Sequence, residues 1–159
     1  MSFCVGDRIA HPMHGAGIID RIEKRKINGL EREYYVLKLP VGDMLVMIPI
    51  GTTEEIGVRP IVHPDQAVVI MESIPGIEIN MTQNWNKRYR ENMLKIKSGD
   101  LMEVAAVVKG LMSREQDRGL STGERKMLHS AKQILISELV LSQDSTYEEV
   151  EEQINTAMA

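Results

Sequence analysis

The pattern of apolar and polar residues changes once along this 159-residue chain, close to residue 63. Before that point, apolar and polar residues alternate in short runs separated by Gly, Pro, Asn and Asp, which is typical of β-strands and tight turns. After it, apolar residues recur every three or four positions, which is typical of amphipathic helices. The pattern predicts an α+β protein with two parts, residues 1–62 and residues 63–159.

Short strands are expected throughout the first part, at residues 5–10, 18–27, 33–39, 44–50 and 58–62. Asn28-Gly29 favours a tight hairpin turn because both residues tolerate positive φ. The segment from His11 to Gly17 holds a proline and two glycines, and we expect it to be a loop. Short antiparallel strands joined by tight turns fit a small closed or half-closed barrel of the SH3 or Tudor type. Such barrels seldom catalyse reactions and often bind peptides or sheet edges.

A helical bundle is expected in the second part. Pro64 suits the first turn of a helix that runs to about Ser73. Asn84 is a candidate N-cap for a helix that begins at Trp85. Further helices are expected where a capping residue is followed three positions later by glutamate, a spacing known as a capping box; the capping residues are Asp100, Ser121 and Ser145.

The segment from Asn84 to Arg90 contains the only tryptophan of the chain, surrounded by basic and amide side chains. In a helix, Trp85 and Tyr89 share one face, and cations lie at the edges of that face. One interpretation is a binding site for a polyanion, since backbone N–H groups at a helix N-terminus can also meet phosphate. In the other, the two rings pack inside the bundle and the cations form a solvated rim. On spacing alone the second interpretation is the commoner one.

Charge is distributed unevenly along the chain. Its net charge of −4 argues against a general nucleic-acid binder, but residues 85–132 hold 11 basic and 6 acidic groups. Residues 133–159 hold 6 acidic groups and no basic one. Even on an acidic protein, a local positive face can contact phosphate. Solvated helix faces without a partner explain the same distribution.

Features of membrane, secreted and metal proteins are missing from the sequence. No apolar run approaches the roughly 18–20 residues that span a bilayer, and the start lacks a basic region followed by an apolar one, so we expect a cytoplasmic protein without a membrane partner. The single cysteine, Cys4, is expected to be a small core residue. His11 and His14 have no accompanying carboxylate or thiol cluster. We therefore expect no metal, no cofactor and no enzymatic activity.

Six short motifs follow one another in a characteristic order: Val5-Gly6-Asp7, His11-Pro12-Met13-His14-Gly15, Asn28-Gly29, Asn84-Trp85-Asn86-Lys87-Arg88-Tyr89, Ser98-Gly99-Asp100 and Arg118-Gly119-Leu120-Ser121-Thr122-Gly123-Glu124. Over essentially its whole length the chain resembles the CarD/CdnL family of bacterial transcription regulators. The resemblance implies a Tudor-like domain, residues 1–62, that docks on the β subunit of RNA polymerase. It also implies a helical domain, residues 63–159, that contacts promoter DNA and stabilises the open promoter complex.

The resemblance also implies which residues make the polymerase contact. Arg25, Lys26 and Ile27 match the strand that pairs with the polymerase β lobe, and Arg25 is the leading candidate. Met47 departs from the family pattern, because some relatives have an arginine there. The methionine raises the question of how much of this interface is apolar and how much ionic.

For the DNA contact, the resemblance implies that Trp85 is a wedge that enters the minor groove at the upstream edge of the transcription bubble. Lys87, Arg88 and Arg90 match positions that lie along the phosphate backbone. Tyr89 is expected to pack inward and aim the tryptophan.

Two alternatives stay open at this point. A protein-only adaptor would bind a strand edge with its barrel and a second protein with its bundle. A metal-dependent enzyme would need His11 and His14. We expect a monomer, with a strand-swapped dimer as the alternative, and the sequence leaves open which promoters respond.

Overall fold

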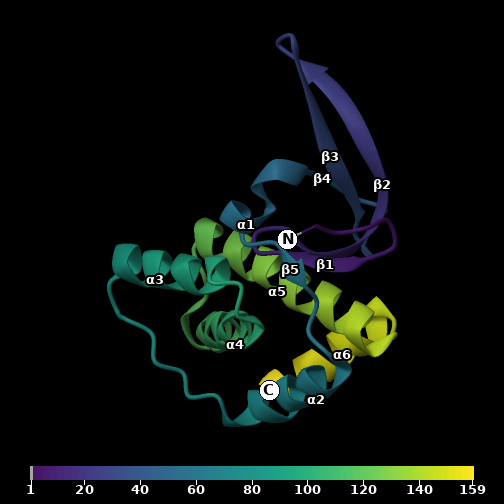
Figure 1. Ribbon diagram of the computed structural model, residues 1–159. Coiled ribbons are helices and arrows are strands. Elements are labelled where there is room, and N and C mark those ends of the chain that lie inside the picture. Colours follow the sequence, from purple (N-terminus) through teal and green to yellow (C-terminus); the bar gives the residue numbers. More distant parts are fainter. Residues whose placement is uncertain (1) are drawn as a thin grey trace.

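The computed structural model describes residues 2–159 and confirms the α+β class, with a small sheet followed by packed helices (Figure 1). The sheet is antiparallel, with strand order β4-β3-β2-β1-β5. Its strands are β1 (Arg8–His11), β2 (Gly15–Ile27), β3 (Leu30–Lys38), β4 (Leu45–Pro49) and β5 (Arg59–Pro60). This arrangement agrees with the expected Tudor-like domain.

One face of the sheet forms its own hydrophobic core. Alternate residues of neighbouring strands meet there, including Ile9, Ile19, Leu37 and Ile48. Phe3 joins this core, and its backbone N–H donates to the Tyr35 hydroxyl at 3.0 Å. The neighbouring Cys4 is exposed, so the expectation that it is a core residue is wrong. Successive residues of an extended segment point to opposite sides, and here Phe3 occupies the inner position.

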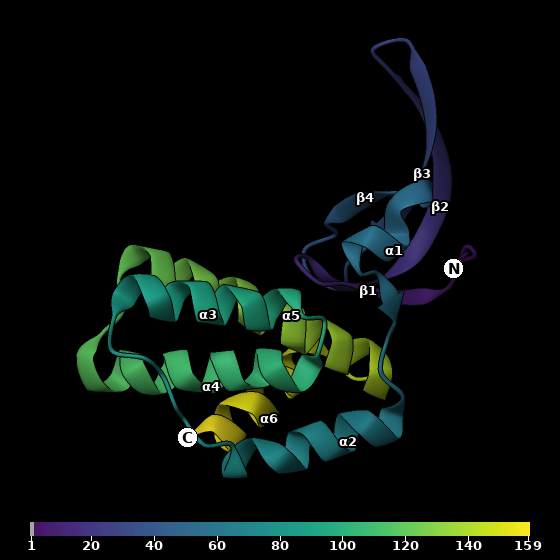
Figure 2. The ribbon, with the colours of Figure 1, turned by 60° about the vertical axis from the view of Figure 1, so that its left-hand side comes forward.

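β2 and β3 form a hairpin that extends far beyond the rest of the sheet (Figures 1 and 2). Asn28 and Gly29 both have positive φ, 53° and 79°, which confirms the predicted tight turn. β1 pairs only with residues 15–18 of β2. Within residues 2–159, the outer edge of β2 from Asp20 onwards therefore has no partner strand.

The expected loop at residues 11–17 is shorter than predicted, because β2 already begins at Gly15. Both glycines allow close packing. A Cβ atom on Gly17 would lie 2.5 Å from the Lys38 carbonyl oxygen, and one on Gly15 would lie 2.5 Å from Ser137 Oγ. In this segment the two glycines let the backbone of β2 lie close to its neighbours, α5 at Gly15 and β3 at Gly17. They do not interrupt the strand.

Six α-helices and two 3-10 turns follow β4 in the described part of the chain. The first turn and helix, η1 (Ile50–Thr52) and α1 (Thr53–Ile56), were not predicted. The others are α2 (Pro64–Ser73), η2 (Ile74–Gly76), α3 (Trp85–Lys97), α4 (Leu101–Arg118), α5 (Thr122–Gln143) and α6 (Tyr147–Met158). None of the helices within residues 2–159 is long and apolar enough to cross a membrane.

The predicted N-caps are confirmed at three helices and displaced at the fourth. Asn84, Asp100 and Ser121 accept hydrogen bonds from the first turns of α3, α4 and α5. At α6 the N-cap is Thr146, one residue after the predicted Ser145. Ser145 instead donates from its hydroxyl to Glu149 at 2.7 Å.

α5 lies at the centre of the molecule. Every residue from Ile134 to Ser142 is buried, all round the helix. A helix that is buried on all sides must have neighbours on all sides. α5 packs against α2, α4 and α6, and also against β2, so it joins the bundle to the sheet (Figure 2).

Candidate functional site

Trp85 is the first residue of α3 and is 42% exposed. Asn84 Oδ1 accepts from the Lys87 backbone N–H at 3.0 Å, so the helix starts here and no preceding turn covers the indole. The ring stacks on Tyr89, one turn later, with centroids 5.1 Å apart and planes 17° apart. Tyr89 packs against the helical core, as expected. Trp85 is thus supported from within the bundle while much of its surface faces solvent.

The first turn of α5 supports the edge of the same indole. Trp85 Nε1 donates to Ser121 Oγ at 3.0 Å. Ser121 Oγ also accepts from the Glu124 backbone N–H at 3.2 Å, so one hydroxyl caps α5 and holds the indole. A Cβ atom on Gly123 would lie 3.6 Å from Trp85 Cζ2. The sequence identified Ser121 as a cap, but no local spacing could reveal a partner 36 residues away.

Arg88 does not lie where the predicted phosphate contact requires it. Its side chain is 2% exposed and makes two hydrogen bonds to the Glu124 carboxylate, at 2.9 and 3.2 Å. Its Nη1 donates to the carbonyl oxygens of Thr82 and Gln83, at 3.1 and 2.9 Å. With its donors used inside the protein, Arg88 is not available to a phosphate, and this prediction is wrong for the structure described here.

The position of Arg88 on its helix explains this burial. Residues four and eight positions later, Asn92 and Ile96, are also buried, and such residues share one face of a helix. Arg88 therefore points toward the core of the bundle. There it fixes the connector before α3 to the first turn of α5.

Glu124 was expected to complete a capping box with Ser121, but its carboxylate turns to Arg88. Burial by itself would raise the pKa of this carboxyl group. The hydrogen bonds and charge of Arg88, with smaller contributions from Arg114 and Ser121, outweigh burial and hold the pKa below its usual value. An ionised pair beneath Trp85 thus fastens α3 to α5.

Lys87 and Arg90 are exposed, as a phosphate contact would require. At about 100° per residue they lie about 200° and 140° around α3 from Trp85, on the outward side of the helix. Arg125 and Lys126, near the start of α5, are also exposed. The sequence analysis did not single out these two cations, because only the fold brings the start of α5 beside the start of α3.

The four candidates for polymerase binding lie on two faces of the sheet. Arg25 pairs with Arg32, Ile27 with Leu30, and Met47 with Val36. Because side chains alternate along a strand, Arg25, Ile27 and Met47 share one face and Lys26 points to the other.

Arg25 and Met47 are well separated on their shared face. Their partners Arg32 and Val36 lie four residues apart on β3, or about 13 Å. The Arg25 side chain is 56% exposed and pairs with Glu23 at 3.2 Å. Its guanidinium group is thus accessible near the free edge of β2.

His11 and His14 lie close together, with ring centroids 4.5 Å apart. Within residues 2–159, no group of three His, Cys, Asp or Glu side chains is placed to hold a metal ion. His11 Nδ1 accepts from the Met13 backbone N–H at 3.0 Å, which fixes the turn between β1 and β2. Burial, and then the charge of His14, lower the pKa of His11 from 6.5 to about 4.

This shift predicts a pH dependence of stability. The unfolded chain takes up a proton on His11 near pH 6.5, and the folded protein only near pH 4. The contribution of His11 to the free energy of unfolding is therefore complete above pH 6.5 and is lost as the pH falls toward 4. Urea unfolding at pH 7 and pH 4.5 should show a smaller loss of stability in His11→Asn than in wild type. An equal loss in both proteins would contradict the assigned shift.

Comparison with known proteins identifies the class to which this fold and these surfaces belong. Residues 3–62 match the family model for the CarD-like/TRCF RID domain, and residues 69–155 match that for the CarD C-terminal domain. This pairing of domains defines a transcription regulator. The chain belongs to the CarD/CdnL family, as its resemblance indicated.

A full-length relative supports the same assignment. The chain is 36% identical over 148 residues to a protein of Bacillus subtilis (strain 168) named "Putative transcription factor YdeB". The aligned region covers 93% of this chain and 97% of that protein. The name of this relative and the two matched domains agree on a role in transcription regulation.

Proposed function

We propose that the protein binds the β subunit of RNA polymerase through its N-terminal sheet and stabilises the open promoter complex with Trp85. The indole would enter the minor groove at the upstream edge of the transcription bubble. One observation carries this proposal: the only tryptophan stands at the start of a helix, fixed by Tyr89 and Ser121 yet 42% exposed. A core tryptophan would be covered, and an unsupported one would have no fixed direction.

The chemistry of an indole suits a partly opened base step. A flat apolar ring replaces lost base stacking without reading a defined sequence, and aromatic–base contacts are worth about 1–3 kcal/mol. Because that surface exists fully only in melted DNA, the protein binds the open complex more tightly than the closed one. This difference in affinity shifts the equilibrium toward the open complex.

The N-terminal sheet offers a suitable surface for polymerase. The outer edge of β2 from Asp20 onwards lacks a partner strand within residues 2–159, and an exposed edge can accept a strand of another protein. Arg25 lies on this segment, where a charged contact could set the register. Tethering to polymerase raises the local concentration of Trp85, so the outward cations Lys87 and Arg90 suffice despite a net charge of −4. Through polymerase, the protein would be found at the nucleoid.

The test is the lifetime of the open complex on a ribosomal RNA promoter with cognate polymerase. In Trp85→Ala the lifetime should fall about fivefold or more, since a stacking contact worth at least about 1 kcal/mol is lost. Polymerase binding should stay as in wild type. The melting curve should stay cooperative, with a modestly lower midpoint because the contacts with Tyr89 and Ser121 are lost. In Arg25→Glu, polymerase binding should weaken and the effect on lifetime should be lost with it.

Trp85→Phe is the matched control, since it keeps a ring that can stack. It should retain part of the wild-type lifetime. An unchanged lifetime in Trp85→Ala would refute the wedge. If in addition the promoter footprint were unchanged in Lys87→Glu/Arg90→Glu, the protein would act as an adaptor between proteins.

A further inference from the structure

A buried carboxylate joins the sheet to the helical bundle. Glu138, in the middle of α5, is 1% exposed. Arg59, from β5, donates to its two carboxylate oxygens at 2.7 and 2.9 Å. The backbone N–H of Val62 donates to the same group at 2.8 Å. Three donors from the end of the N-terminal domain thus meet one carboxylate of the central helix.

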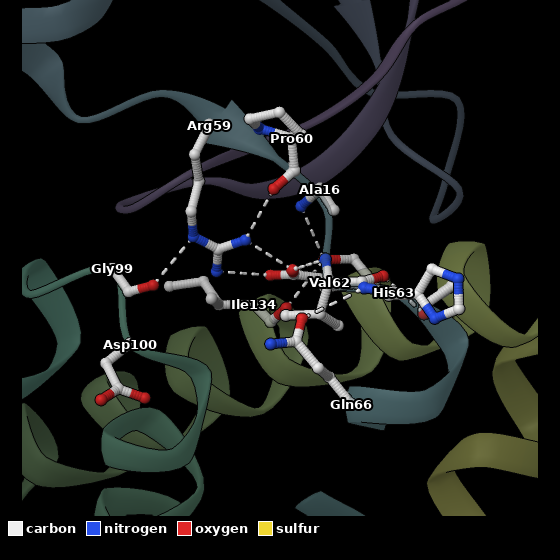
Figure 3. Close-up of polar contacts among 12 residues, drawn as sticks. Ala16, Arg59, Pro60, Val62, His63, Gln66, Gly99, Asp100 and Ile134 are labelled. Carbon is white, nitrogen blue, oxygen red and sulfur yellow. Dashed lines mark hydrogen bonds and ion pairs between the residues drawn. The ribbon is translucent and has the colours of Figure 1, made fainter. Parts of the chain in front are cut away.

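Arg59 reaches a second part of the bundle with the same side chain. Its Nε donates to the Gly99 carbonyl oxygen at 2.9 Å, in the turn between α3 and α4 (Figure 3). A planar guanidinium group with several donors fixes both distance and angle. Arg59 therefore ties the sheet to α5 and, through this turn, to the end of the helix that carries Trp85.

Other contacts extend this joint along α5. The Ala16 backbone N–H donates to Ser137 Oγ at 2.9 Å, and Ser142 Oγ donates to the Val62 carbonyl oxygen at 2.8 Å. Arg8 pairs with Asp144 at 2.9 Å. The N-terminal domain thus contacts α5 from Ser137 to Ser142, and also Asp144 just after the helix ends. Tilting the two parts would break several of these contacts.

The other end of α5 holds the tryptophan. Ser121, its N-cap, accepts the hydrogen bond from the indole, and Glu124 forms the buried pair with Arg88. From Ser121 to Glu138 is 17 residues, or about 26 Å of helix. After Gly123 this helix contains no glycine and no proline, the residues at which helices bend. One continuous helix therefore connects the joint to Trp85.

We infer that α5 and the Arg59–Glu138 joint set the position of Trp85 relative to the polymerase-facing sheet, so that both contacts form at once. Arg59 and Glu138 are positioning residues in this scheme, which rests on the proposed function. Two contacts on one rigid body reinforce each other most when their separation matches that of their targets. A loose joint would leave each contact intact and lower the probability of making both.

The rigidity of the joint is tested first, on the full chain, by double electron–electron resonance, which measures the distribution of distances between two spin labels. Spin labels are placed at Lys38→Cys on β3 and Leu94→Cys on α3, both exposed, in a Cys4→Ser background. Wild type should give one narrow distance distribution. Arg59→Met/Glu138→Gln removes the ion pair and the Gly99 contact but keeps an acceptor for the Val62 N–H. This double variant should lose the single narrow peak. The single variant Arg59→Lys, which keeps the charge, should retain much of that peak.

The function is tested with the same variants in the open-complex assay. Arg59→Met/Glu138→Gln should shorten the lifetime about three- to tenfold through the lower effective concentration of the second contact. Its affinity for polymerase alone should equal that of wild type. If this variant loses its cooperative melting curve, Ser142→Ala replaces it and should give a smaller change in both measurements.

Two results would overturn the inference. In the first, the distance distribution stays narrow without the ion pair. In the second, it broadens while the open-complex lifetime stays unchanged. In either case a shortened lifetime in Trp85→Ala would leave the proposed function standing, so the two failures can be told apart.

Discussion

Arg88→Ala is expected to lower the free energy of unfolding by about 3–5 kcal/mol, because it leaves the buried carboxylate of Glu124 without its partner. The pair is almost completely shielded, with side chains 2% and 3% exposed. The carbonyl oxygens of Thr82 and Gln83 lose their donor as well. Urea unfolding followed by circular dichroism measures the difference. Since small domains are stable by about 5–15 kcal/mol, this loss is large enough to unfold part of the population.

Arg90→Ala is the matched control for this prediction. It removes the same side chain from the same helix at an exposed position, and its effect should stay within about 0.5 kcal/mol. The comparison also separates the two roles considered for Arg88. A phosphate-binding Arg88 would leave stability unchanged when removed and weaken only the promoter contact. That result would contradict the buried position described here.

Gly15→Ala should also destabilise the protein, by about 2–4 kcal/mol. Gly15 has a φ of 98°, a conformation that L-residues with a Cβ atom adopt only at a cost. The new methyl group would lie 2.5 Å from Ser137 Oγ and 3.3 Å from Ile134 Cα. Ser137 could turn away only by giving up its hydrogen bond with the Ala16 N–H. Thermal and urea unfolding should both show the loss.

Gly29→Ala isolates the backbone contribution to that loss. Gly29 also has a positive φ, 79°, but a Cβ atom there would meet nothing within 4 Å. Only the cost of the left-handed conformation, about 1–2 kcal/mol, should remain. The excess in Gly15→Ala then measures how closely β2 packs on α5. Equal losses in the two variants would mean that the close approach costs nothing.

Local sequence patterns predicted most of the secondary structure. Asn28-Gly29 identified the hairpin because its turn depends on the φ values of those two residues alone. Ser121 identified the start of α5 because a cap bonds within its own first turn. The errors were also local: Thr146 replaced Ser145 as a cap, and β2 began at Gly15 inside an expected loop. In the second case the glycines serve close packing, which sequence spacing does not reveal.

The candidate site was predicted in outline but not in its division of roles. Trp85 and Tyr89 were correctly assigned to one helical face, with Tyr89 inward. Arg88 and Arg90 looked alike in sequence, yet one is buried and the other exposed. The difference comes from Glu124, whose carboxylate lies 36 residues away in the chain and offers a partner to one of the two positions only.

The sequence by itself determined the change from strands to helices near residue 63, the turns and the caps, because these depend on residues within a few positions of each other. It also determined the family. Only the tertiary structure decided that Arg88 supports the bundle, that Ser121 holds the indole of Trp85, and that Glu138 joins the two parts. Each of these depends on a partner distant in sequence, and a buried charge or N–H group takes whichever partner the packed chain brings within reach.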